Sequence, residues 1–369
     1  MALRLDRIAF KNFRNYPDFV LSCDKNICII VGANAVGKTN IIEGIQLMTG
    51  MDTFRSVKWD ELCTWGTDTA RVDAFISGDD RIIEMNMMLQ QGKRSYLLNG
   101  KKKRIAELRG LLPVVLFTPD DLRMIKDDSS KRREALDFIG IQLSKTYSSL
   151  KNDFEKIVRQ RNKLLKDQII NVGLVDSWTA SLVLIGSRFY QHRHNLFERL
   201  REKVMAIHAE LVPHEQLDIR YVPSWERDSE AVNEISQELA DLKDIRNVFS
   251  VAIDERRGKE LERRMTLIGP HRDEIIFYID GRDARKYASQ GQQRSIVLSW
   301  KLAEVALIKE IGGQPPVLLL DDVMSELDES RRSSLMTYAY ENVQTFITTT
   351  NTGYFNDEML NSSQLVYLR

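Results

Sequence analysis

The sequence predicts an α/β fold in which one head domain is formed from both ends of the chain, with an antiparallel helical arm inserted between them. Three observations support this prediction. The first third alternates short apolar strands with turns, the middle third follows a heptad pattern, and the last third alternates strands and helices. The predicted division is residues 1–124 for the first part of the head, 125–262 for the arm and 263–369 for the second part of the head.

The composition excludes several classes of protein. Lys+Arg and Asp+Glu balance at 53 each over 369 residues, so a nucleic-acid site has to be a local patch rather than a global charge. Three cysteines without CxxC spacing (Cys23, Cys28 and Cys63) favour a reducing, cytoplasmic location over a disulfide framework. No apolar run reaches the ~18 residues of a membrane span, and no Cys/His cluster predicts a zinc site.

Strands dominate the expected first part of the head. The run at residues 26–31 is almost wholly apolar, which is typical of a buried strand. Alternating segments separated by turn signals predict an antiparallel lobe downstream of it. The strands expected here lie at residues 3–8, 19–21, 26–31, 71–76, 81–89, 95–98 and 114–117.

The middle of the chain predicts two long helices that pair through apolar seams with steps of three and four residues. The first seam is interrupted by Arg161, and Gly173 lies in the loop between the two helices. The first seam comprises Leu136, Ile139, Leu143, Tyr147, Leu150, Phe154, Ile157 and Leu164. The second comprises Trp178, Leu182, Ile185, Phe189, His192, Leu196, Leu200 and Val204. A strand at 217–222 and a third helical stretch at about 230–262 follow.

The last third returns to alternating strands and helices. Strands are expected at 275–279, 317–322 and 344–349, and helices at 292–311 and 329–340. Such alternation predicts a parallel sheet shared with the strands of the N-terminal part.

A phosphate-binding loop follows the apolar strand at 26–31. Residues 32–39 fit G-x-x-x-x-G-K-[ST] and open a helix, which is the structural context that the motif requires. We expect Lys38 to reach the β- and γ-phosphates and Thr39 to ligate Mg²⁺. The nucleotide-binding residues are therefore Gly32, Ala33, Asn34, Ala35, Val36, Gly37, Lys38 and Thr39.

Two adjacent acids end the apolar strand at 317–322. Charged residues at the carboxyl end of a buried strand lie beside the ligand crevice of an α/β sheet. We expect Asp321 to hold Mg²⁺, and Asp322 to orient or deprotonate the attacking water, which makes Asp322 and Lys38 the catalytic residues.

A second anion cradle is predicted at Ser289, Gln290, Gly291 and Gln292, just before the helix at 292–311. One active site does not need two such cradles. The economical solution is that this segment faces the nucleotide of a second subunit, so that ATP joins two copies of the chain.

The order of these motifs resembles the ATP-binding-cassette superfamily. The segment at 289–292 is similar to the cassette signature with Gln290 in place of its first glycine, and Asp322 stands where most cassettes carry glutamate. The long insertion between the motifs resembles the SMC/Rad50-like branch, so the resemblance implies a P-loop ATPase head of that type. The switch histidine of the cassettes is replaced within residues 347–351 (ITTTN).

Within that branch the chain resembles the RecF family of bacterial DNA repair proteins. The matching segments are 12–16 (NFRNY), 37–40 (GKTN), 117–122 (FTPDDL), 159–162 (RQRN), 269–273 (GPHRD) and 319–328. The resemblance adds Arg14 and Asn40 to the nucleotide-binding residues. It implies a homodimer that depends on ATP and Mg²⁺, clamps double-stranded DNA near single-strand gaps and hydrolyses ATP slowly with stimulation by DNA. It also implies a role with RecO and RecR in loading RecA, in replication-fork maintenance and in the SOS response.

Two basic runs are candidates for contacts with DNA phosphates, namely Lys101, Lys102, Lys103 and Arg104, and Arg132 with Arg133 at the base of the arm. Each run is also consistent with an exposed hairpin tip or a solvated helix face. His271 and Arg272 either contact DNA or nucleotide, or tie the base of the arm to the sheet.

Three alternatives remain open from the sequence. The first is an architectural, SMC-like DNA clamp, which a long coiled coil would favour over the expected arm of roughly 30 residues, or about 45 Å, per helix. The second is a transporter nucleotide-binding subunit, which the inserted arm disfavours. The third is a phosphotransferase, which would lack the segment at 289–292.

Overall fold

The computed structural model describes residues 3–55, 57–78, 81–226, 241–340 and 343–369, and these residues form two compact units. The first unit comprises Met1–Leu122 and Arg294–Arg369, and the second comprises Arg123–Gln293. Residues 263–293, which the sequence-based division assigns to the head, group with the helical unit. The physical reason is strand pairing, because β10 (Glu274–Ile279) is antiparallel to β9 (Leu217–Val222) of that unit.

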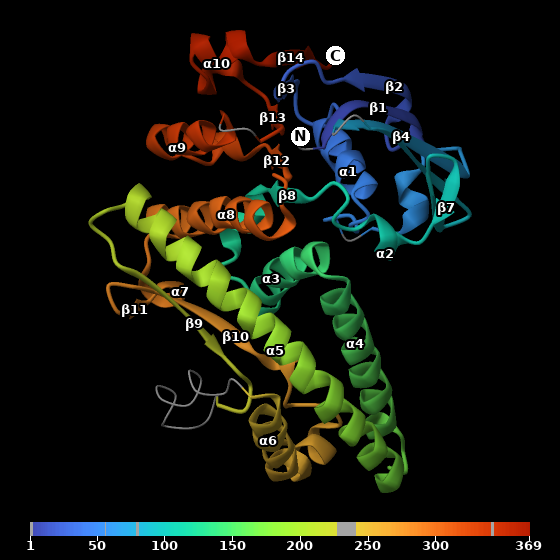
Figure 1. The fold of residues 1–369 in the computed structure, drawn as a ribbon, viewed down its shortest axis with the longest axis vertical. Helices are drawn as coiled ribbons and strands as arrows, with labels where there is room; N and C mark the ends of the chain where they lie inside the picture. The colour runs from blue at the N-terminus through green and yellow to red at the C-terminus, as the bar shows by residue number, and fades with distance from the viewer. Residues whose placement is uncertain (1–2, 56, 79–80, 227–240, 341–342) are drawn as a thin grey trace. The chain divides into compact units, whose positions relative to one another are not determined.

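The first unit contains a five-stranded parallel sheet in the order β14-β3-β13-β12-β8 (Figure 1). β3 and β12 are buried along their whole length, as their apolar sequences predict. The strands are β3 (Ile27–Val31), β8 (Val114–Phe117), β12 (Val317–Asp321), β13 (Thr345–Thr349) and β14 (Gln364–Tyr367). The last of these was not expected from the sequence.

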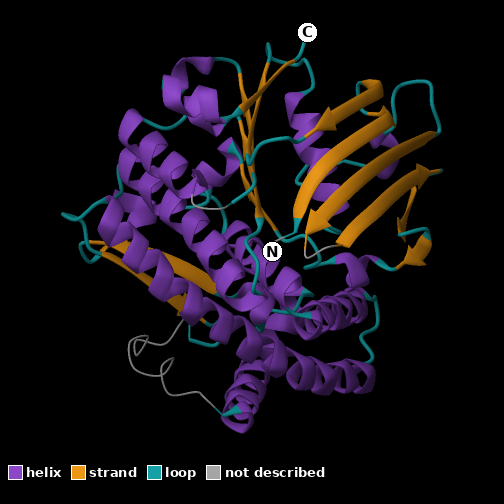
Figure 2. Cartoon of the chain, turned by 45° about the horizontal axis from the view of Figure 1, so that its top comes forward, coloured by secondary structure: helices purple, strands orange, loops and turns teal. Residues whose placement is uncertain are grey.

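A six-stranded antiparallel sheet, seen in orange on one side of Figure 2, completes the first unit. Helix α1 (Lys38–Met48) packs against strands of both sheets, so it lies between them. α9 (Glu329–Tyr340) and the part of α8 (Gln290–Gly312) from Arg294 onwards cover the opposite face of the parallel sheet (Figure 1). The six strands are β1 (Arg4–Phe13), β2 (Tyr16–Ser22), β4 (Thr69–Gly78), β5 (Arg81–Gln90), β6 (Lys93–Leu98) and β7 (Lys101–Lys103).

Short elements connect these layers. They are η1 (Trp59–Leu62), α2 (Ile105–Leu108), η2 (Pro119–Arg123), η4 (Val323–Ser325), η5 (Thr352–Tyr354) and α10 (Asp357–Ser362). Among the described residues, no helix combines the length and the apolar character that crossing a bilayer requires.

The second unit is built on four helices and a small sheet in the order β11-β10-β9. α4 and α5 run side by side, as the two apolar seams predict, and α6 packs on α5 (Figure 1). The helices are α3 (Ser129–Leu143), α4 (Lys145–Lys166), α5 (Val172–Leu211) and α6 (Leu242–Arg263). The remaining elements are η3 (Pro270–Arg272), β11 (Arg282–Asp283) and α7 (Ala284–Tyr287).

The arm differs from its prediction in three details. The first seam runs through two helices, because Ser144 leaves helical geometry (φ −144°, ψ 121°) and its hydroxyl accepts a hydrogen bond from the Tyr147 amide, which starts α4. α4 has 22 residues and α5 has 40, instead of about 30 each. In the second seam, Arg193 is buried and its neighbour His192 is exposed. The start expected for the third helical stretch lies outside the described residues.

Candidate nucleotide-binding site

The phosphate-binding loop lies between the carboxyl end of β3 and the first turn of α1, where the sequence places it. Gly37 is the residue before the helix, with φ of 113°. A Cβ atom at this position would lie 2.4 Å from Asn15 Nδ2 and 2.8 Å from the Tyr16 hydroxyl. Both the backbone conformation and the close approach therefore require glycine.

Lys38 is buried and bends back over the loop. Its Nζ donates hydrogen bonds to the carbonyl oxygens of Gly32 (2.8 Å) and Ala33 (2.9 Å). The ammonium group is thereby held within the loop whose backbone N–H groups, in this motif, converge on phosphate. When phosphate binds, its charged oxygens replace the two neutral carbonyl oxygens as acceptors for the Lys38 ammonium group. Hydrogen bonds between charged groups are stronger than those to neutral acceptors.

Thr39 and Asp321 meet at the edge of the parallel sheet. The Thr39 hydroxyl donates to Asp321 Oδ1 at 3.0 Å, and the Thr348 hydroxyl donates to the same oxygen at 2.7 Å. Burial raises the pKa of the Asp321 carboxyl above its usual value, and hydrogen bonds from Thr348 and Thr39 oppose that rise. Hydroxyl and carboxylate oxygens are the ligands that Mg²⁺ prefers, so this pair fits the metal site expected from the sequence.

Asp322 follows directly, and its backbone adopts a left-handed conformation with φ of 55°. Its amide donates to the Thr348 hydroxyl at 2.9 Å. Burial raises the pKa of the Asp322 carboxyl, the charge on Lys38 lowers it, and Glu326 raises it. A non-glycine residue held in this conformation carries strain, which is common where a side chain has to point at a ligand.

Thr348 was not identified as a site residue from the sequence. It joins the backbone of Asp322 to the carboxylate of Asp321, at the strand end where the cassettes carry their switch histidine. The sequence does not single it out, because three of the five residues of β13 (TFITT) are threonines. Its importance depends on register, because β13 lies between β3 and β12 and pairs Thr348 with Asp321.

Arg14 and Asn40 belong to a polar network behind the loop. Arg14 donates to both oxygens of the fully buried Glu43 at 2.8 and 2.9 Å. Asn40 donates to Asn15 Oδ1 and accepts from Arg55, both at 2.8 Å. Glu43 and Arg55 were not identified from the sequence. A buried carboxylate on an apolar helix is the signal that could have indicated a paired arginine.

Ala35 occupies the one position of the loop where a non-glycine residue has positive φ, 65°. We expect Ala35→Gly to stabilise the nucleotide-free protein by about 0.5–1 kcal/mol, because relief of left-handed strain outweighs the added entropy of the unfolded chain. Ala33→Gly is the matched control, since Ala33 has no positive φ, and it should destabilise by about 0.4–1 kcal/mol. Urea unfolding measures both. Equal shifts in the two variants would contradict a strained Ala35.

Ser289 caps helix α8 in a reciprocal arrangement. Its hydroxyl accepts from the Gln292 amide at 3.2 Å, and the Gln292 side chain accepts from the Ser289 amide at 2.9 Å. This is a capping box, so the helix begins at Gln290, two residues earlier than expected. Ser289 and Gln290 are exposed, and Gly291 lies in the first turn of this 23-residue helix. The N-terminus of α8 is therefore accessible to an anion.

The two basic runs have different environments. Lys101, Lys102 and Arg104 are exposed on and after β7, while Lys103 forms an ion pair with Glu107 at 3.0 Å. The first run is therefore accessible to a large anionic partner.

Arg132 and Arg133 correct the prediction for the second run. Arg132 is 3% exposed, bonds Glu274 at 2.7 Å and donates to backbone oxygens of Met124, Ile125 and Asp127. Arg133 is half-buried and donates to the Asp273 carbonyl at 2.6 Å, and burial lowers the pKa of its guanidinium. Both guanidinium groups bond within the helical unit, and Arg132 is too deeply buried to contact DNA.

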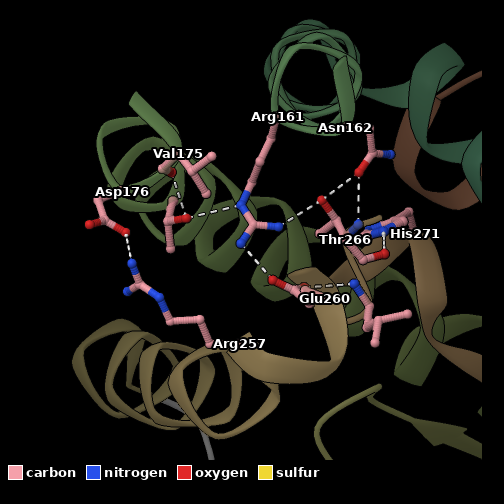
Figure 3. A network of polar contacts seen from close by, with 10 residues as sticks. Arg161, Asn162, Val175, Asp176, Arg257, Glu260, Thr266 and His271 are labelled. Atoms are coloured by element: carbon pink, nitrogen blue, oxygen red, sulfur yellow. Dashed lines mark hydrogen bonds and ion pairs between the residues drawn. The ribbon is translucent and has the colours of Figure 1, made fainter. Parts of the chain in front are cut away.

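The segments 159–162 and 269–273 are linked through Thr266 inside the second unit (Figure 3). Arg161 bonds Glu260 at 2.5 Å and Thr266 at 2.9 Å, and Asn162 accepts from the amide of Thr266 at 2.7 Å. His271 lies against the same turn, with Nε2 3.2 Å from the Thr266 carbonyl oxygen, and burial lowers its pKa to about 3. The buried position of His271 supports a role in tying the base of the arm to the sheet over a contact with DNA or nucleotide.

The fold and the site define an ATP-binding-cassette-type ATPase head of the SMC class. The family model described as RecF/RecN/SMC N terminal domain matches residues 4–367. A head domain of Smc bound to the C-winged helix domain of ScpA is similar in fold alone, with a TM-score of 0.53 and 16% identity over 97% of this chain and 91% of that one.

More similar relatives are proteins named DNA replication and repair protein RecF. The one from Oceanobacillus iheyensis is 34% identical over 369 residues, covering 98% of each chain, and the one from Synechococcus sp. is 36% identical over 362 residues, covering 96% and 93%. The structure of the recombination mediator protein RecF-ATPrS in the RecFOR pathway matches with a TM-score of 0.87 and 30% identity, covering 96% and 94%. The chain belongs to the RecF family of DNA replication and repair proteins.

Proposed function

We propose that this chain is an ATP-driven switch of recombinational DNA repair, in which two copies close around two nucleotides and hold double-stranded DNA near single-strand gaps. The observation that carries the proposal is that the Thr39 hydroxyl, in the first turn of α1, lies 3.0 Å from Asp321 Oδ1 at the carboxyl edge of the parallel sheet. This is the arrangement that a P-loop ATPase uses to bind a nucleoside triphosphate with its metal. Relatives named for RecF, one of them described with ATP, support the same reading.

Each subunit contributes its own loop and acids to the nucleotide. Lys38 neutralises charge on the terminal phosphates, and Asp322 takes the proton of the attacking water while its backbone is fixed by Thr348. Thr39 and Asp321 would hold Mg²⁺, which supplies charge neutralisation of the phosphate oxygens. Hydrolysis is slow and stimulated by DNA, as the family resemblance implies, so the protein acts as a switch and not as a metabolic enzyme.

The second subunit contributes the segment headed by Ser289. A capped helix N-terminus offers partial positive charge and backbone donors to the γ-phosphate. ATP is then shared between two copies, and its differential affinity for the closed pair shifts the population towards the dimer. Loss of the γ-phosphate removes the shared ligand and the pair opens.

The closed pair binds duplex DNA through phosphates and without reading its sequence. Lys101, Lys102 and Arg104 are the exposed candidates, with Lys103 beside them. In the cell, the protein would act in the cytoplasm with RecO and RecR to help load RecA, and so support replication forks and the SOS response. These partners follow from the family, whose matched structure is described as part of the RecFOR pathway.

Ser289→Arg tests the shared nucleotide. The variant should bind ATP as a monomer with unchanged affinity and fail to dimerise, because a bulky cation blocks the second half of the site. Sizing by light scattering with ADP, with ATP, and with ATP plus duplex DNA measures the oligomer, and calorimetry measures ATP binding. Ser177→Arg, an equally large change at an exposed position of α5, is the control and should dimerise normally. A Ser289→Arg monomer that loses ATP affinity would place this segment in its own subunit's site and refute the sharing.

A further inference from the structure

A basic pocket of about 380 Å³ lies at the end of α6 in the helical unit. Its volume falls within the roughly 300–1,000 Å³ typical of ligand pockets. Four cationic side chains, one serine and two apolar residues line it: Arg256, Lys259, Arg263, Arg272, Ser224, Leu267 and Ile268. We name it the α6 pocket. None of its lining residues belongs to the nucleotide-binding site.

The cations reach the pocket through the spacing of α6. Arg256, Lys259 and Arg263 are three and four residues apart, which places them on one face of the helix. Arg257 and Glu260 line another pocket of the unit, where Arg257 bonds Asp176 at 2.7 Å and Glu260 bonds Arg161 at 2.5 Å (Figure 3). The helix thus separates charges that stabilise the fold from charges that face the pocket.

Arg272 completes the pocket from η3, on a turn held rigidly in place. The buried carboxylate of Asp273 accepts from the Tyr221 hydroxyl at 2.6 Å and from the Ser224 amide at 2.8 Å. Arg272 itself has a sulfur contact with Met265 at 3.7 Å, and its buried Nε has no hydrogen-bond partner in the described structure. Arg272 therefore adds a fourth cation beside the three on α6, and hydrogen bonds of the neighbouring Asp273 fix the backbone that carries it.

Three of the four cations of the pocket are not matched by a carboxylate among the described residues. Within the described part of the chain, Lys259, Arg263 and Arg272 form no ion pair with a carboxylate. Like charges one turn apart repel each other and weaken a helix by a few tenths of a kcal/mol per pair. In a chain whose net charge is zero, such a concentration of one sign favours an anionic ligand.

We propose that the α6 pocket binds the phosphate groups of a nucleic-acid backbone. Guanidinium groups offer paired donors that match phosphate oxygens, and Leu267 with Ile268 forms an apolar wall against which a deoxyribose can pack. This inference rests on the proposed function for its choice of DNA as ligand. It adds a second contact region, on the helical unit, that does not depend on ATP for its formation.

The test compares Lys259→Glu/Arg263→Glu with Lys11→Glu/Lys309→Glu, a double variant with the same charge change at exposed lysines of the other unit. Both residues changed in the pocket are exposed, so folding should be preserved. Fluorescence anisotropy with a labelled duplex measures the dissociation constant with and without a non-hydrolysable ATP analogue, over a range of salt concentrations. The pocket variant should bind duplex at least about tenfold more weakly, and its salt dependence should fall by about two units of slope, since about 0.9 is lost for each phosphate contact. Lys259→Arg should restore most of the affinity when tested alone against Lys259→Glu.

Two further measurements separate this proposal from the proposed function. ATP-dependent dimerisation should be unchanged in the pocket variant. If the wild-type chain itself fails to dimerise, the proposed switch is refuted, but the comparison of duplex affinities by anisotropy still tests the pocket. Duplex binding equal to that of the control variant would overturn the pocket proposal. A second outcome would also overturn it: tripolyphosphate or poly-glutamate stabilises the wild type against heat but not the pocket variant, while the two bind duplex equally well. The ligand would then be a soluble anion or an acidic protein segment.

Discussion

Asp322→Asn should abolish ATP turnover while preserving ATP binding, and it should leave a dimer that persists after ATP is added. The amide keeps the size of the side chain and its position after β12, but it cannot accept the proton of the attacking water. Loss of a general base slows the chemical step by roughly 10²–10⁴-fold. In the proposed switch the dimer opens on loss of the γ-phosphate, so the closed state should accumulate. Phosphate release and light scattering in the same sample measure both effects.

Glu326→Gln is the control for loss of a nearby negative charge. Glu326 is half-exposed and forms an ion pair with Arg294 at 3.1 Å, and its charge raises the pKa of Asp322. Glu326→Gln should change the turnover rate only a few-fold, whereas loss of the general base in Asp322→Asn should lower it by about 10²-fold or more. Since the pKa of Asp322 is raised, wild-type turnover should also fall with decreasing pH earlier than an ordinary aspartate would dictate. An Asp322→Asn variant that turns over normally would show that another group activates the water.

Arg161→Met should strongly destabilise the helical unit. Arg161 is 2% exposed and Glu260 is 1% exposed, and they are 2.5 Å apart at the point where α4, α5 and α6 meet (Figure 3). Arg161 also donates to Thr179 of α5 and Thr266 at 2.9 Å each. Removing it leaves the buried carboxylate of Glu260 without its cation, which costs about 3–5 kcal/mol. Hydrogen exchange of the amides in α4, α5 and α6 reports the loss.

Arg257→Met is the matched control on the same helix. Its partner Asp176 is 2.7 Å away, but the two side chains are 44% and 49% exposed, so the pair contributes less than about 1 kcal/mol. The double variant Arg161→Met/Glu260→Leu should recover much of the lost stability, because well-packed apolar groups often replace a buried ion pair without cost. Equal exchange rates in the Arg161 and Arg257 variants would rule out a special role for the buried pair.

Local sequence patterns were sufficient for the elements whose cause is local. The loop at residues 32–39, the apolar strands β3 and β12 and the acids at the end of β12 each depend on adjacent residues. Parallel strands align their carboxyl ends, so the meeting of Thr39 with Asp321 could be expected from the order of elements. The family resemblance drew on the same short segments, and the comparisons confirmed it.

Other assignments failed because residues of the same type have opposite environments. Arg132 was a candidate for contact with DNA and Arg161 was expected only to interrupt the first seam, yet both are buried and paired with acids more than 90 residues away in the sequence. The α6 pocket also depends on a distant residue, since Arg272 comes from η3 while the other cations belong to α6. No window of sequence reveals such partners, because burial of a charge depends on which distant segment supplies its counter-charge.

The sequence by itself determined the phosphate-binding loop, the carboxylates beside it and the alternation of strands and helices around an inserted arm. These features arise from side-chain periodicity and backbone conformations that act over a few residues. Only the tertiary structure decided that Thr348 links Asp321 to Asp322, that Arg14 pairs with the buried Glu43, and which arginines are buried. The reason is that sheet register and helix packing set which distant polar groups meet, and a buried polar group is stable only where such a partner is present.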